Sequence, residues 1–163
     1  MYTSVLSLLL VPALASVAVA QTKISGATQC GKPDLQHMVQ VGDRPNHAFA
    51  ISKNKCNWTK PFEIAGAQSK EDEGTNFAEI TGNSASDRGY VVGAMSSGDK
   101  STVRYQGKSV LKDGVPQTSE GTWSYTAGTG KLKGIKGKGT YKGKATADGG
   151  MTFEIEGEYQ LPK

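Results

Sequence analysis

The chain lacks most of the features that mark membrane proteins and helical domains. After residue 20 it has no apolar stretch long enough to enter a membrane, and almost no helical periodicity. Its first twenty residues contain no Lys, Arg, Asp or Glu, and the whole chain has only two cysteines. These absences argue against stable membrane insertion and against a helical fold.

Residues 1–20 have the composition of an export signal. The apolar run from Val5 to Ala15 is too short to cross a bilayer, and Ala18-Val19-Ala20 supplies small residues before Gln21. The pattern predicts a signal peptide at residues 1–20 and a single mature domain at residues 21–163. The short apolar run disfavours the alternative, an N-terminal membrane anchor. The chain is therefore expected to be exported.

The two cysteines, Cys30 and Cys56, fit this compartment. An even cysteine count in an exported protein predicts one disulfide. Two free thiols or a metal pair are the alternatives, but neither cysteine lies in a C-x-x-C motif or has histidine at zinc-ligand spacing. The bridge would join a loop-like segment, residues 25–34, to the end of an early strand.

Short alternating runs separated by Gly, Asp and Asn predict an all-β domain. Polar loops are expected at residues 69–76 and 84–89, and a hairpin connection at residues 146–150. Evenly spaced strands in a chain of this size favour a sandwich or a closed barrel. The predicted strands are residues 36–41, 46–56, 61–66, 75–82, 88–96, 101–110, 119–127, 132–144 and 151–160.

Residues 128–144 are unusual because six of the seventeen are glycine and six are lysine. The spacing matches neither a Walker loop nor G-x-G-x-x-G, so a nucleotide site is excluded. A polyanion-binding arm is the other functional interpretation. The net charge of +4 is mild and specifies no partner on its own.

Alternation gives this stretch a structural interpretation. From residue 135 to 144, glycine and apolar residues share one face and lysines share the other; residues 151–161 do the same with glutamates. An odd-numbered turn pairs these strands with their apolar faces together, so the lysines form a solvated face matched by glutamates and no nucleic-acid partner is expected. The expected neighbours are Lys142 with Glu154 or Glu156, and Lys138 with Glu158 or Gln160.

Glycines and turns between residues 88 and 144 follow a characteristic order: Gly98-Asp99, Gly107, Gly128-Thr129-Gly130 with Leu132, then Gly137 and Gly139. This order resembles that of the allene oxide cyclase and dirigent barrel superfamily, in an exported bacterial branch. The resemblance implies a single antiparallel β-barrel of about eight strands with an apolar interior. It also implies cofactor-free chemistry, but transfers no catalytic residue. With the predicted signal peptide, an exported bacterial protein is expected in the periplasm or outside the cell.

Asp43, Arg44 and His47 are the most concentrated polar group. At a barrel mouth they could bind an anionic head group or perform acid–base chemistry; alternatively, Asp43 and Arg44 close a turn of "GDRPN" composition. His37 and His47 have no acidic or Cys partner at diagnostic spacing, so no metal site is predicted.

Phe49, Trp123, Tyr125 and Tyr141 are candidates to line a ligand cavity, although aromatic residues also fill ordinary cores. The patterns together predict an exported β-barrel that binds a small apolar molecule or guides its reaction. The alternative is a non-catalytic envelope or interaction module with a filled barrel. No G-x-S-x-G elbow or other catalytic motif is present, so catalysis stays an open question, as does the oligomeric state.

Overall fold

The computed structural model describes residues 21–163, and the predicted signal peptide at residues 1–20 lies outside the described residues. The only helical element in the described range is a 3-10 turn, η1 (Gly130–Leu132). No helix among residues 21–163 is long and apolar enough to cross a membrane. The strands are β1 (Thr22–Cys30), β2 (Leu35–Gln40), β3 (His47–Lys60), β4 (Glu63–Ile64), β5 (Ala67–Thr81), β6 (Ser84–Met95), β7 (Lys100–Lys112), β8 (Val115–Gly128), β9 (Lys136–Ala145) and β10 (Met151–Gln160).

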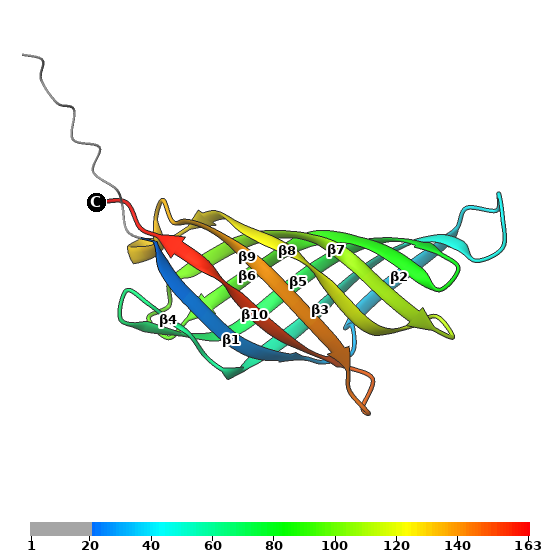
Figure 1. Ribbon diagram of the computed structural model, residues 1–163, viewed down its shortest axis with the longest axis horizontal. Coiled ribbons are helices and arrows are strands. Elements are labelled where there is room, and N and C mark those ends of the chain that lie inside the picture. The colour runs from blue at the N-terminus through cyan, green and yellow to red at the C-terminus, as the bar shows by residue number, and fades with distance from the viewer. Residues whose placement is uncertain (1–20) are drawn as a thin grey trace, which may run out of the picture.

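Eight of these strands form a closed antiparallel barrel (Figure 1). The ring runs β3–β1–β10–β9–β8–β7–β6–β5, and pairing of β5 with β3 closes it. Closure gives every strand of the ring two neighbours. The β1–β3 contact is a short one, because it covers only Ala27–Cys30 of β1. The predicted all-β fold and the eight-stranded barrel are confirmed.

Two short strands lie outside the ring. β2 pairs with the first half of β3, and β4 pairs with the start of β5. The second half of β3 pairs with β1, so β1 and β2 follow one another along the same edge of β3. Figure 1 shows β4 near one end of the barrel and β2 toward the other.

Several predicted boundaries were wrong. Residues 25–34 are not loop-like, because most of them belong to β1, the strand that joins β3 to β10. Residues 69–76 and 84–89 are not loops but parts of β5 and β6. The strand expected from residue 132 begins at Lys136, because residues 130–132 form η1.

The predicted disulfide is confirmed: Cys30 and Cys56 are bonded and lie opposite each other in the β1–β3 register. Both side chains point into the barrel, where they are 4% and 7% exposed. The bridge fastens the last residue of β1 to β3 just before the chain leaves the ring.

The β9–β10 hairpin has the predicted register, with Lys142 opposite Glu154 and Lys138 opposite Glu158. The Thr146 N–H donates to the Gly150 carbonyl at 3.0 Å, which leaves an odd-numbered turn of residues 147–149. Gly149 has a φ of 81°, a left-handed conformation that glycine adopts readily.

Lys142 provides a direct test of the charge-matched outer face. It lies between Glu154 of β10 and Glu120 of β8, so Lys142→Glu places three like charges side by side. We expect the free energy of unfolding to fall by about 1 kcal/mol, measured by urea denaturation, because like charges directly opposite destabilise a sheet. Adding Glu154→Lys should recover much of the loss.

Lys136→Glu is the matched control, because Lys136 lies opposite the uncharged Gln160. An equal loss of stability in both single variants would contradict the charge-matching interpretation.

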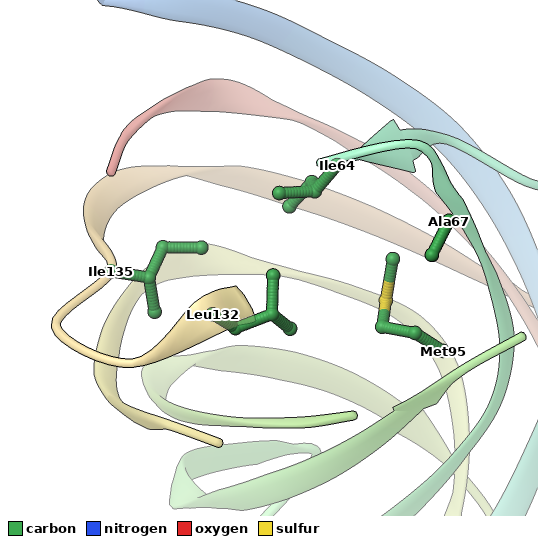
Figure 2. Packing of buried hydrophobic residues seen from close by; sticks show 5 residues of the cluster. All are labelled: Ile64, Ala67, Met95, Leu132 and Ile135. Atoms are coloured by element: carbon green, nitrogen blue, oxygen red, sulfur yellow. The ribbon is translucent and has the colours of Figure 1, made fainter. Parts of the chain in front are cut away.

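One end of the barrel is closed by an apolar plug. Residues from β4, β5, β6, η1 and the chain before β9 point toward one another there (Figure 2). Ile64 and Leu132 are each 1% exposed, the most deeply buried large side chains among the described residues. The plug consists of Ile64, Ala67, Met95, Leu132 and Ile135.

Candidate functional site

The middle of the barrel is lined by aromatic rings that lie against glycines of neighbouring strands. The Trp123 indole covers Gly139 and Gly157, and a Cβ at Gly139 would come 2.6 Å from its Cζ2 atom. The Tyr141 hydroxyl lies in the same way over Gly107 and Gly121. Glycine is needed on these inner faces because any side chain would occupy the volume of a ring.

Trp123, Tyr125 and Tyr141, all candidate ligand-lining residues, lie on this inner wall. Trp123 and Tyr125 meet edge to face with ring centroids 5.2 Å apart, and the Trp123 indole N–H donates to the Thr140 carbonyl at 3.2 Å. Tyr141 packs at right angles to Tyr105 with centroids 6.0 Å apart. The rings therefore form a continuous aromatic layer in the barrel.

Phe49 lies elsewhere. It is on the outer face of β3, 37% exposed, and stacks on Phe77 of β5 with centroids 5.5 Å apart. The Arg88 guanidinium carbon lies 4.4 Å from the centre of the Phe77 ring. Phe49 therefore does not line the barrel interior, and the prediction that it lines a ligand cavity there was wrong.

Asp43, Arg44 and His47 are brought together at the turn that joins β2 to β3. Arg44 Nη1 donates to Asp43 Oδ2 at 2.7 Å, and His47 Nδ1 lies 2.5 Å from Asp43 Oδ1. His47 Nε2 lies 3.2 Å from Glu79 Oε1. Carboxylates thus engage both ring nitrogens of His47.

These contacts favour the charged forms of His47 and Asp43, which suits an ion pair that closes the turn. The hydrogen bond that His47 donates to Asp43 raises the pKa of His47, with a further contribution from Glu79, and the same hydrogen bond lowers the pKa of Asp43. His47, with Asp43 and Glu79, holds the start of β3 beside the end of β5. The turn between β5 and β6 adds a backbone contact there, since the Gly82 N–H donates to the Asn46 carbonyl. The geometry favours turn closure over acid–base chemistry.

A polar group inside the barrel, centred on Asp87 of β6, was not predicted from the sequence. Ser109 Oγ donates to Asp87 Oδ2 at 2.5 Å. The Tyr105 hydroxyl donates to Asn76 Oδ1 at 2.8 Å, and the Asn76 side chain faces the same carboxylate. Burial raises the pKa of Asp87, and the hydrogen bonds from Ser109 and Asn76 offset part of the rise.

The surroundings of Asp87 differ from the aromatic layer because small side chains line the wall. Asp87 lies between Ala78 and Gly107 in the register of β5, β6 and β7. We call this part of the barrel, at the end opposite the plug, the alanine end. Its buried cluster is Ala50, Ala78, Ala85 and Leu111, with Ile80 packed against it.

Tyr141 lies next to this group and has an unused hydrogen-bonding group. Its hydroxyl is buried without a hydrogen-bond partner, and the nearby Ser119 hydroxyl acts to lower the pKa of Tyr141. Burial is the main cause that raises the pKa of Tyr141 to about 12. Tyr141 therefore stays protonated at neutral pH and can donate a hydrogen bond.

A second interior carboxylate, Asp72, lies on the inner face of β5, closer to the plug than Asp87. It is opposite Cys56 on one side and Gly93 on the other. Burial raises its pKa to about 6, and the indole N–H of Trp58 offsets part of the rise. That N–H faces Asp72 without reaching hydrogen-bond geometry, since the buried Trp58 nitrogen has no partner.

Other features of the described residues offer less to a ligand. No group of three or more His, Cys, Asp or Glu side chains within residues 21–163 is arranged to hold a metal ion. A broad open concavity lies on the outer face of β1 and β7 to β10. Its charged side chains include Lys23 and Glu158, which pair with each other at 2.7 Å, so the interior group is the stronger candidate site.

The fold and the interior group define a small antiparallel β-barrel, plugged at one end, with acidic side chains on its inner wall. Its fold is similar to that of two pterocarpan synthase dirigent proteins, GePTS1 (TM-score 0.50, 11% identity, 94% of this chain and 98% of that chain) and PsPTS1 (0.51, 13%, 88% and 97%). It is equally similar to a protein of unknown function of the DUF3224 family from Shewanella oneidensis MR-1 (0.51, 11%, 88% and 99%).

No family model and no curated protein sequence matches the chain. Identities of this size establish the fold alone. The resemblance to the dirigent-type barrel is therefore confirmed as a resemblance of fold.

Proposed function

We propose that the protein is an exported barrel that binds a small, mostly apolar molecule at its alanine end. Asp87, Ser109 and the free hydroxyl of Tyr141 would meet a polar group on that molecule, and the alanines would pack against its apolar part. The barrel could also guide a reaction of the bound molecule without a cofactor. The disulfide between Cys30 and Cys56 supports export, because such bridges persist in oxidising compartments.

The observation that carries the proposal is the Asp87 carboxylate on the inner wall among small side chains. Removing a carboxylate from water costs free energy, and the raised pKa of Asp87 reflects that cost. Buried groups with perturbed ionisation, beside apolar side chains and a few convergent polar atoms, are typical of ligand sites.

Asp87→Asn tests the proposal. Protein isolated from its native envelope would be analysed by native mass spectrometry and by extraction of bound small molecules. We expect Asp87→Asn to retain roughly tenfold less ligand, because a hydrogen bond to a charged group is lost.

Asp72→Asn is the matched control, since it changes the other interior carboxylate near the plug and should keep its ligand. Loss of ligand in both variants, or in neither, would contradict an assignment to the alanine end.

A second candidate is a non-catalytic module whose barrel is filled by its own side chains. The plug favours it, because Ile64 and Leu132, each 1% exposed, fill one end of the barrel with the protein's own side chains. This alternative predicts no bound molecule in native material and a more stable protein after Asp87→Asn. The ligand-binding proposal predicts a co-purified molecule that raises the melting temperature.

A further inference from the structure

β2 has one unpaired edge. It pairs with β3 alone, and within residues 21–163 no strand pairs with its other side. The Val41 N–H donates to the His47 carbonyl at 2.9 Å, so the alternation of an antiparallel ladder turns the backbone groups of every second residue away from β3. The backbone groups that face the free edge belong to Gln36, Met38 and Gln40.

The free edge lacks the usual protection against pairing. Natural edge strands are blocked by lysines, prolines, bulges or short length. β2 reads LQHMVQ, six exposed residues without Lys, Arg, Asp, Glu or Pro. By contrast, the outer face of β9 carries four lysines and that of β10 three glutamates. Backbone pairing at β2 therefore meets no charged obstacle.

An apolar stripe runs beside this edge on the outer face. Val39 is 66% exposed and lies opposite Phe49, and Ile51, 49% exposed, is the next outward residue of β3. Leu35 continues the same face of β2. Six of the ten large exposed hydrophobic residues in the described chain lie on β2, on the first half of β3 or directly after β2. We call Leu35, Val39, Phe49 and Ile51 the edge stripe.

We propose that β2 pairs in an antiparallel manner with β2 of a second copy of this chain, which makes a two-fold dimer with one continuous sheet. The free backbone groups require an extended strand as occupant. A two-fold pairing also joins the edge stripes of both copies on one face of the new sheet.

The charges in and around β2 permit a second copy. β2 itself has no Lys, Arg, Asp or Glu, so two antiparallel copies place no like charges opposite each other along the paired strands. After β2, Asp43 and Arg44 already pair with each other within the chain, and before β2 Lys32 and Asp34 carry one charge of each sign. Both ends of β2 are therefore close to neutral, and a second copy brings an identical apolar edge stripe to the pairing.

Two variants and a control test this dimer by sedimentation of the full mature protein over a range of concentrations. Val39→Lys places a charge beside the two-fold axis, and Met38→Pro removes a donor that faces away from β3. We expect each to raise the dimer dissociation constant at least about tenfold, as expected for unfavourable charge or a lost donor at an interface centre. Val110→Lys, at a comparably exposed apolar residue of β7, should leave it unchanged.

Amide hydrogen exchange identifies the surface. In the dimer the amides of Gln36, Met38 and Gln40 should exchange slowly, and dilution or Val39→Lys should release them. A protein that stays monomeric at about 1 mM, the weak limit of specific affinity, would overturn the proposal. So would a dimer with those three amides unprotected, or vesicle binding by a monomer that is lost in Val39→Lys.

Discussion

Breaking the bridge between Cys30 and Cys56 should lower the free energy of unfolding by about 3.5 kcal/mol, because the bonded cysteines are 26 residues apart and the bridge restricts the unfolded chain. The structural position of the bridge adds to this expectation. β1 joins β3 to β10 in the ring, and the bridge fastens the last residue of β1 to β3. Without it the seam between β1 and β3 should open first.

Urea denaturation with and without reductant measures this effect. Reduced wild-type protein keeps both sulfur atoms in the core and loses only the cross-link. The Cys30→Ala, Cys56→Ala double variant should be at least as unstable, because it also leaves two small voids in a buried region. Equal stability of the oxidised and reduced proteins would contradict a role for the bridge in ring closure.

The β9–β10 hairpin could be predicted from the sequence because its two faces have opposite character. Lysines and glutamates mark the outer face, and glycine and apolar residues mark the inner one, so the alternation fixed both the strands and their register. The role of the inner glycines could be recognised only from the structure. Trp123 lies over Gly139 and Gly157, and the three residues come from three different strands.

Parts of β5 and β6 were predicted as loops because they are rich in polar residues, and the same residues form the candidate site. Residues 69–76 and 84–89 are polar on both faces, so they give no alternating signal and resemble loops. Asp72 and Asp87 are the inward-facing carboxylates of these segments. Single-sequence reasoning places a polar residue outside by default, and only the ring shows that these two face inward.

The candidate cluster of Asp43, Arg44 and His47 shows the opposite case. Its residues are close in sequence, so their proximity could be foreseen, and the structure brings them together. Its chemistry depends on Glu79, which is 32 residues from His47 and reaches it through the β3–β5 pairing. That partner occupies the second imidazole nitrogen, which sequence spacing alone could not reveal.

Asp72→Asn should stabilise the protein at neutral pH. The pKa of Asp72 rises from its usual 3.8 to about 6 because the carboxylate is buried, and a rise of that size corresponds to about 3 kcal/mol in favour of the protonated form. The folded state therefore binds this proton more tightly than the unfolded state. The contribution of Asp72 to stability is fully present below pH 3.8 and is lost as the pH rises through about 6.

Urea denaturation at pH 7 and at pH 4 separates this contribution from other titrations. At pH 7 the Asp72→Asn variant should be more stable than wild type by up to about 3 kcal/mol, and the difference should shrink as wild-type Asp72 takes up its proton near pH 4. The lowered pKa values of Asp43, Glu73 and Glu158 make both proteins less stable in acid, but these groups are common to both and cancel in the difference. Asp34→Asn, at an exposed position before β2, is the matched control and should leave stability unchanged at both pH values. If the difference in unfolding free energy between Asp72→Asn and wild type does not change with pH, burial does not raise the pKa of Asp72. A loss of stability at pH 7 would mean that the carboxylate makes contacts in the barrel that an amide cannot replace.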